Sequence, residues 1–389
     1  MPNDPNEPPP TSPRLFAFPS RTRLIFGAGS VDHVGELARE LGARQILLVT
    51  DAGIVAAGHA GLVRKHLEAA GLRVTTFDRA RENPTTKCVA DCVAAAKAAG
   101  IDTIIGLGGG SSMDTAKGCN FILTNGGRMQ DYWGVGKATK PMLPFIAIPT
   151  TAGTGSEMQS AALIADEQTH QKMACLDPKC AAAIAILDPS LTLSQPARVT
   201  ACTGIDAIAH AVETAVTTKR NAVSEKFSQE AFRLCMSALP EVLVAPQELD
   251  ARGRMQLGAA YAGAAIEHSM LGAAHAAANP LTAHFGIVHG HAVGLMLPHV
   301  VRFNAVEAHV REIYQRLASE VGLGADDLAS PLAGLLELTS MPRTLATCGI
   351  DRAALPMLAA EAAKQWTAGF NPRPVLAADF LVLYAAALD

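Results

Sequence analysis

The sequence has no excess of basic residues. It contains 32 Lys and Arg against 36 Asp and Glu in 389 residues, so the formal net charge is −4 at pH 7. A chain with this balance has no broad basic surface to attract nucleic acid or an anionic membrane. We therefore expect neither as a partner and predict that the ligand is a small molecule.

The signatures of membrane, secreted and repeat proteins are also missing. No apolar run reaches the roughly 18 residues that a membrane span needs, and no basic segment followed by an apolar one opens the chain. The eight cysteines are scattered through apolar segments without repeated pair spacing, which is typical of reduced core residues and not of a disulfide scaffold. No repeat of solenoid length is visible. These absences predict a cytoplasmic globular protein.

The composition that remains divides the chain into two parts. Hydrophobic residues make up 49% of the sequence, enough for the cores of two domains. Residues 1–13 are rich in proline and polar residues and are predicted to form a flexible tail. Over residues 14–190, short apolar runs alternate with alanine-rich helical stretches, which predicts an α/β domain whose parallel sheet is covered on both faces. Alanine, leucine and methionine dominate residues 191–389, which predicts an all-helical domain. The expected strands are 45–49, 74–77, 103–107, 145–148 and 183–187.

A glycine-rich turn follows the expected strand 103–107 and precedes a helical segment. It consists of Gly108, Gly109, Gly110, Ser111 and Ser112. Glycines let a phosphate approach the backbone, and the unpaired amides at a helix start favour an anion. The turn therefore predicts a site for the pyrophosphate of a dinucleotide. It fits the dinucleotide-binding fingerprint only in part, and tight turns also use glycine for packing.

Two further strand ends carry polar residues. Asp51 follows the strand 45–49, and the segment PTTAGTGSE (149–157) follows the strand 145–148. Ligands of open α/β sheets bind at the carboxyl ends of the strands. A carboxylate at Asp51 can accept hydrogen bonds from the adenosine ribose and would repel a 2′-phosphate, which favours NAD over NADP; the alternative is that Asp51 only caps a helix. The hydroxyls and glycine amides of 149–157 suit phosphates and ribose.

Histidine gathers in the second half. Asp206 and His210 stand four residues apart in an apolar helical stretch, which places them on one face of a helix, although a simple hydrogen bond also explains such a pair. Residues 271–300 hold five of the twelve histidines. His275 lies in an alanine-rich helix, where an unpaired imidazole is costly, and His289 follows in a turn. One carboxylate and three imidazoles predict a catalytic Fe²⁺ or Zn²⁺ site. The other three histidines are expected to be structural or to support the ligands: His284, His291 and His299.

Together, these ordered motifs resemble the iron-dependent (group III) alcohol dehydrogenase family. The matching segments are FGAGSV (26–31), VTD (49–51), NPT (83–85), GGGSSMDTAK (108–117), PTTAGTGSE (149–157), GIDAIAHAVE (204–213), HAAANPL (275–281) and VHGHAVGLMLPH (288–299). They span nearly the whole chain apart from the N-terminal tail. Several motifs in the same order are far more specific than any one of them.

The resemblance implies the dehydroquinate-synthase-like architecture of this family, with a catalytic cleft between the two domains. It implies hydride transfer between C4 of NAD(H) and a small alcohol or aldehyde bound to the metal, and a homodimer or larger homo-oligomer. The implied metal ligands are Asp206, His210, His275 and His289. The implied cofactor contacts are Asp51, Gly109, Gly110, Ser111, Asp114, Thr150, Thr151, Thr154 and Lys172.

The chain departs from the family pattern at Asn279. Many members have a further histidine at this position, four residues after the third ligand, where it is assigned to proton relay or nicotinamide contact. Asparagine is neither an acid nor a base near neutral pH. Either water, a ribose hydroxyl or another histidine moves the proton here, or the substrate differs from simple primary alcohols.

Other functions on the same architecture remain open. They are a maleylacetate reductase without metal, a zinc-dependent glycerol dehydrogenase and a dehydroquinate-synthase-like cyclase. The intact ligand set argues against the metal-free enzyme, and the scarcity of basic residues around the ligands argues against the cyclase. A non-catalytic nucleotide-binding protein would be favoured by loss of a ligand, and none is lost.

Overall fold

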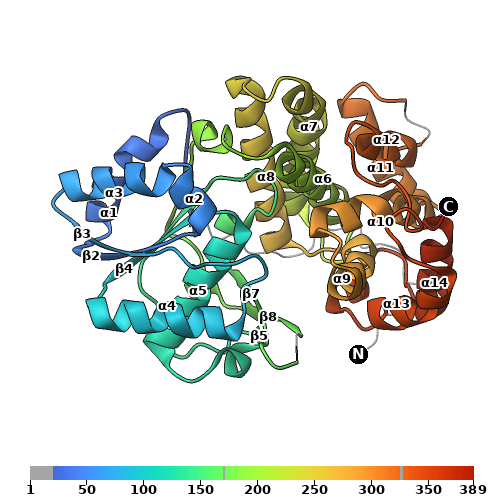
Figure 1. Cartoon of the computed structure of the whole chain (residues 1–389). Helices are drawn as coiled ribbons and strands as arrows, with labels where there is room; N and C mark the ends of the chain where they lie inside the picture. The colour runs from blue at the N-terminus through green and yellow to red at the C-terminus, as the bar shows by residue number, and fades with distance from the viewer. Residues whose placement is uncertain (1–20, 170, 325–326) are drawn as a thin grey trace.

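The computed structural model describes residues 21–169, 171–324 and 327–389. The predicted tail, residues 1–13, lies outside these residues. An α/β half is followed by a helical half (Figure 1). The strands are β1 (Arg23–Phe26), β2 (Gln45–Val49), β3 (Arg73–Phe77), β4 (Thr103–Gly108), β5 (Gly134–Val135), β6 (Phe145–Pro149), β7 (Ala161–Ala165), β8 (Lys172–Leu176) and β9 (Ile184–Leu187).

The helices of the first half are α1 (Val34–Glu40), α2 (Ala52–Ala56), α3 (His59–Ala69), α4 (Thr86–Ala99) and α5 (Gly110–Asn125). Those of the second half are α6 (Ala197–Thr214), α7 (Ala222–Val244), α8 (Leu249–His268), α9 (Ala273–Phe285), α10 (His289–Asn304), α11 (Ala308–Glu320), α12 (Ala329–Glu337), α13 (Leu355–Ala362) and α14 (Ala377–Ala386). The connection from Leu187 to α6 contains a short 3-10 helix, η5 (Pro189–Thr192). The proposed domain division at residue 190 lies within this connection.

The large sheet is parallel and six-stranded, in the order β1-β9-β6-β4-β2-β3. The five strands expected from the sequence are present as β2, β3, β4, β6 and β9, so the predicted α/β fold with a parallel sheet is confirmed. A smaller sheet, β5-β8-β7, was not predicted. Two of its strands give a weak signal, because β5 has two residues and β8 begins with a lysine, whereas β7 is an apolar run that the sequence interpretation overlooked. The edge strand β1 was missed as well.

Both faces of the large sheet are covered, as the strand sequences require. Ile46 and Leu48 of β2 pack in one core with residues of α1 and α3, whereas Leu47 and Val49 pack in another with residues of α4 and α5. This alternation follows from the two-residue period of a strand. Figure 1 shows the two helical layers on opposite sides of the sheet. The carboxyl ends of the central strands are therefore left free for ligands.

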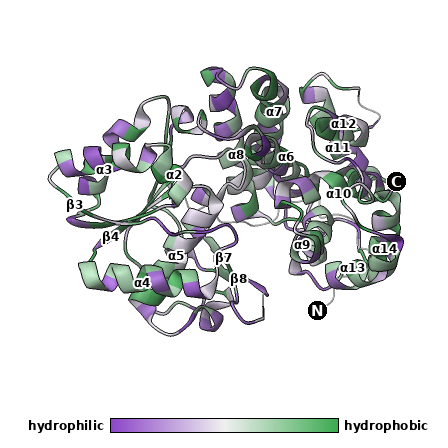
Figure 2. Ribbon diagram, viewed as in Figure 1, coloured by the Kyte–Doolittle hydropathy of each residue, from purple (hydrophilic) through white to green (hydrophobic). Residues whose placement is uncertain are grey.

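The second half is a bundle of helices around one apolar core. Buried residues of α6, α7, α9, α10, α12 and α14 share this core, and Figure 2 shows hydrophobic segments in α7, α10 and α12. From α6 onward, the described part of the chain contains no strand. Across the described residues, we find no helix with the length and apolar character that crossing a membrane requires.

Glycines bring the two halves into close contact. The turn after β6 lies against α6 and α8, and the Gln256 Nε2 of α8 donates to the Pro149 carbonyl oxygen at 3.1 Å. A Cβ atom on Gly263 of α8 would lie 2.3 Å from the Gly155 carbonyl oxygen, and one on Gly153 would lie 2.4 Å from the Thr203 Cβ of α6. Any side chain at these positions would push the turn away from the helical half.

We predict that Gly263→Ala destabilises the protein by about 1–3 kcal/mol, because its methyl group overlaps the Gly155 backbone. Gly334→Ala is the matched control, since a Cβ atom at Gly334 of α12 meets nothing within 4 Å. The control should be neutral or stabilising by up to about 1 kcal/mol, as expected for alanine in a helix. Urea unfolding measures both. Equal urea midpoints for the two variants would show that the close contact between Gly263 and Gly155 does not limit side-chain size where the two halves meet.

Candidate metal centre and cofactor cleft

Helix α6 carries the first two predicted ligands. Asp206 and His210 are both buried, and Asp206 Oδ1 lies 3.6 Å from His210 Nε2. The start of α10 packs directly on α6, because a Cβ atom on Gly290 would lie 2.0 Å from the Cys202 carbonyl oxygen. This glycine allows His289, the first residue of α10, to lie beside Asp206.

Three of the four predicted metal ligands meet closely, and the fourth, His289, lies beside them. Asp206 Oδ1 lies 3.3 Å from His275 Nε2 and 3.9 Å from His289 Nε2. The rings of His210 and His275 are stacked with their centroids 4.8 Å apart, and the His275 and His289 centroids are 5.4 Å apart. One candidate ligand atom each from Asp206, His210 and His275 lies within 4.8 Å of the others. Segments far apart in the sequence thus form one cluster, which we call the metal centre.

The donor set of the metal centre fits a divalent cation. Asp206 Oδ1 and His275 Nε2 are buried, face each other and have no hydrogen-bond partner. Buried polar atoms in this state are costly unless something satisfies them, and a cation bound between them would do so. The side chains of His210 and His275 are 6% and 4% exposed, whereas that of His289 is 31% exposed. The open side of the centre, where a substrate could enter, is therefore next to His289.

Glu213 is a member of the site that the sequence interpretation missed. Its Oε2 lies 2.5 Å from His275 Nδ1, and both side chains are buried. Burial lowers the pKa of His275, but the carboxylates of Glu213 and Asp206 outweigh it and raise the pKa to about 9. Burial likewise raises the pKa of Asp206, and the neighbouring imidazoles outweigh it and lower this pKa. The signal for Glu213 was its spacing, seven residues after Asp206 on the same face of α6.

The predicted cofactor residues lie at three adjacent strand ends. Strands β2, β4 and β6 are neighbours in the sheet, and they lead into Asp51, the glycine turn at 108–110 and the segment after Pro149. Cβ atoms on Gly109 and Gly110 would contact the side chains of Thr151 and Thr154, at 3.4 and 2.9 Å. The backbone of Thr150 donates to the Gly108 carbonyl oxygen. The glycine turn at 108–110 therefore has no side chains of its own over its backbone and lies beside the threonine hydroxyls of the segment after β6.

Asp51 makes the helix cap considered for it and also faces the glycine turn. Its Oδ1 accepts a hydrogen bond from the Ile54 amide at 3.0 Å, so it caps α2. Its Oδ2 accepts one from the Ser112 hydroxyl at 3.3 Å, which turns it toward the glycine turn. The helix cap and a place at the cofactor edge are thus compatible.

Two other predicted residues, Asp114 and Lys172, interact with each other, and Lys172 also interacts with the metal centre. Asp114 on α5 accepts a hydrogen bond from the Ser156 hydroxyl at 3.2 Å. The Lys172 ammonium interacts electrostatically with the carboxylates of Asp114 and Asp206 and donates to Asn83 Oδ1 at 3.5 Å. Neighbouring Lys117 is buried and donates to three carbonyl oxygens and a hydroxyl. Lys117 therefore ties the segment 156–161 to α5, whereas the charge of Lys172 acts on Asp206 of the metal centre.

The remaining polar residues of the C-terminal motifs face other groups. Asn279 donates to Gln365 Oε1 at 3.0 Å. His284 pairs with Glu361 at 2.7 Å, and His291 Nε2 lies 2.7 Å from the Pro342 carbonyl oxygen.

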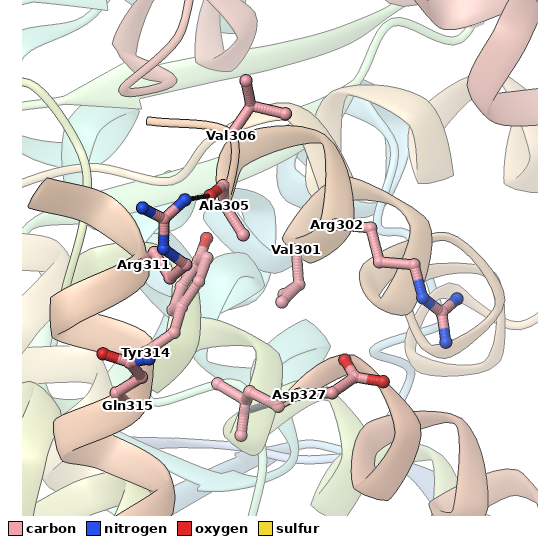
Figure 3. Close-up of a pocket in the computed structure, with 9 residues that line it drawn as sticks. Val301, Arg302, Ala305, Val306, Arg311, Tyr314, Gln315 and Asp327 are labelled. Atoms are coloured by element: carbon pink, nitrogen blue, oxygen red, sulfur yellow. Dashed lines mark hydrogen bonds between the residues drawn. The ribbon is translucent and has the colours of Figure 1, made fainter. Parts of the chain in front are cut away.

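A cavity of about 450 Å³ opens between α10 and α11, and Figure 3 shows Arg302 and Arg311 on opposite sides of it. None of the predicted site residues lines it.

The chain matches known sequences over almost its full length. Residues 21–189 match the family model described as iron-containing alcohol dehydrogenase, and residues 200–388 match that of the Fe-containing alcohol dehydrogenase family, C-terminal. The NAD-dependent methanol dehydrogenase of Bacillus methanolicus is 33% identical, over 94% of this chain and 97% of that protein. The lactaldehyde reductase of Escherichia coli (strain K12) is 31% identical, over 93% of this chain and 97% of that protein.

Solved structures give the same result. The crystal structure of a 1,3-propanediol oxidoreductase superposes with a TM-score of 0.92 at 30% identity, covering 96% of this chain and 100% of that one. Family models, a full-length relative and the architecture thus agree with one another. The chain belongs to the iron-containing alcohol dehydrogenase family and is an oxidoreductase that acts on alcohols.

Proposed function

We propose that this protein interconverts a small alcohol and its aldehyde, with NAD(H) as the redox partner and Fe²⁺ or Zn²⁺ held by Asp206, His210, His275 and His289. The observation that carries the proposal is the meeting of Asp206, His210 and His275 around unpartnered buried atoms, with His289 beside them. Relatives are named for methanol and for lactaldehyde, which supports a short alcohol or aldehyde as substrate.

The residues of the chain divide the work between two adjacent sites. A bound cation supplies a Lewis acid that activates the substrate oxygen, and NAD supplies the hydride acceptor. Asp206 contributes the negative charge that partly neutralises the cation, and the imidazoles contribute neutral donors. The amides at 109–111 receive the pyrophosphate, with Thr150, Thr151 and Thr154 at the neighbouring strand end. Lys172 interacts with both Asp114 and Asp206, and Lys172 and Asp114 would hold the nicotinamide ribose and ring.

Asp51 gives the proposal its preference for NAD. Its carboxylate accepts a hydrogen bond from Ser112 and so lies beside the glycine turn. The hydroxyls of an adenosine ribose bound at this edge would donate hydrogen bonds to it. A 2′-phosphate there would meet a like charge. We also propose that the enzyme acts in the cytoplasm and that it forms a homodimer or larger homo-oligomer. Light scattering on the purified protein would test the oligomeric state.

Removal of the metal is predicted to lower turnover by about a hundredfold or more, because activation of the substrate oxygen is worth several kcal/mol. NADH binding, followed by its fluorescence, should change little because the strand-end site remains intact. The metal content of each sample is measured by elemental analysis. Full turnover in protein shown to be metal-free would reject the proposal, and restoration by added Fe²⁺ or Zn²⁺ identifies the ion.

His289 is the most exposed of the four predicted ligands, so its role needs a separate test. We predict that His289→Ala weakens Zn²⁺ binding by more than about a hundredfold, since loss of a direct ligand costs more than loss of a supporting group. His284→Ala is the control, because His284 pairs with Glu361 and not with the cluster. Calorimetric titration of both variants with Zn²⁺ measures the effect. Equal affinities would leave only three ligands from the chain.

Asp51→Asn is predicted to raise kcat/KM for NADPH relative to NADH by about tenfold or more, because it removes the charge that opposes a 2′-phosphate. Asparagine is as good a helix cap as aspartate, so the contact to the Ile54 amide and the stability should be kept. Asp51→Ala makes the same electrostatic change and additionally loses about 1 kcal/mol of cap stability. An unchanged cofactor ratio in both variants would assign Asp51 to capping alone.

A further inference from the structure

Glu213 occupies a position that the ligand set does not explain. It lies on α6, the same helix as Asp206 and His210, and it is buried with 4% of its side chain exposed. A buried carboxylate is costly unless it is paired and hydrogen-bonded. We propose that Glu213 is a positioning residue of the metal centre, which keeps the proton of His275 on Nδ1 so that Nε2 is free to bind the cation. This inference rests on the proposed function.

The contact between Glu213 and His275 determines which ring nitrogen carries the hydrogen. Glu213 Oε2 lies 2.5 Å from His275 Nδ1. An ionised carboxylate can only accept hydrogen bonds, so Nδ1 must be the donor. Nε2 is the nitrogen left for a cation, because it faces Asp206 Oδ1 at 3.3 Å without a hydrogen-bond partner, and metal binding would displace any hydrogen on it. The tautomer that Glu213 selects is therefore the one that a metal ligand needs.

The second oxygen of Glu213 fixes the position of the helix that carries His275. Oε1 accepts a hydrogen bond from the Ala274 amide at 2.6 Å. Helix α9 has no side-chain cap of its own, because Gly272 is its N-cap residue. Glu213 supplies that cap from a neighbouring helix, and a Cβ atom on Gly272 would approach Glu213 Oε1 to 3.2 Å. Both carboxylate oxygens are thus committed, and the rotamer is held.

A second residue caps α9 without touching its histidine. Asn371 Oδ1 accepts a hydrogen bond from the Ala273 amide at 3.3 Å, and Asn371 forms a reciprocal amide pair with Asn304 at 2.7 and 3.1 Å. Asn371 therefore provides a matched control. It anchors the same turn of the same helix, so a role of Glu213 in helix anchoring alone would be shared by both residues.

Glu213→Gln separates the tautomer effect from the shape of the side chain. Glutamine has one oxygen, which can accept either from the Ala274 amide or from His275 Nδ1. If it stays with the amide, its NH₂ group faces Nδ1 and donates to it, which moves the imidazole hydrogen to Nε2. That hydrogen would then occupy the position of the cation. The variant keeps nearly the same volume and loses the correct tautomer.

The test is titration of the metal-free proteins with Co²⁺, followed by its visible absorption bands. We expect Glu213→Gln to bind Co²⁺ about 10–100 times more weakly than the unaltered protein, with altered bands. Asn371→Ala should lose thermal stability but keep its Co²⁺ affinity within about threefold. Equal affinity of Glu213→Gln and the unaltered protein would overturn the inference, as would an equal loss in Asn371→Ala, which would assign the effect to anchoring of α9.

A second measurement covers the case in which Glu213→Gln does not fold. In the unaltered, Zn²⁺-loaded protein labelled with ¹⁵N-histidine, we expect the His275 signals, assigned with His275→Asn, to show the hydrogen on Nδ1. A hydrogen on Nε2 would overturn the inference. Failure of the proposed function is distinguishable, because it would appear as absence of Co²⁺ binding in the unaltered protein.

Discussion

The site depends on a carboxylate buried among imidazoles. Asp206 is almost fully shielded from water, and its Oδ1 contacts nitrogen atoms of His210, His275 and His289 within 3.9 Å. Removing such a charge from water costs on the order of several kcal/mol, and the surrounding imidazoles offset that cost, which lowers the pKa of Asp206. The carboxylate is therefore held in its charged form, which is the form that binds a cation. The fold has to hold these side chains together.

Close backbone contacts do much of this holding. Gly290 lets α10 approach α6 closely, which brings His289 beside Asp206. Gly155 and Gly263 let the turn after β6 lie against α8. The same turn bears Thr150 and Thr154, which border the glycine turn, so the glycine contacts fix the proposed cofactor edge relative to the metal centre. Under the proposed function, hydride transfer needs the two reactants within contact distance. Small residues at the junction would serve that need by letting the two halves pack closely.

The sequence predicted the parts of this structure that have strong local signals. Short apolar or β-branched runs identified β2, β3, β4, β6 and β9, and the spacing of Asp206 and His210 identified one helix face. It missed the edge strand β1 and the strands of the small sheet, β5, β7 and β8. No local pattern relates His275 and His289 to Asp206, about 70 and 80 residues earlier. Their grouping was predicted from the residue types, as histidines in an apolar and histidine-rich segment, and was also implied by the family resemblance.

The sequence of α6 contains a signal that could have predicted Glu213 as part of the site. From Gly204 to Thr214 every residue of α6 is buried, and a helix buried on all sides is expected to be apolar throughout. The three ionisable residues in this stretch, Asp206, His210 and Glu213, are the exceptions. Each is costly where it stands, and their spacing of four and then three residues aligns them on one face toward α9 and α10. In a helix of this kind, the polar residues that break the apolar pattern mark the site, including those that never touch the ion.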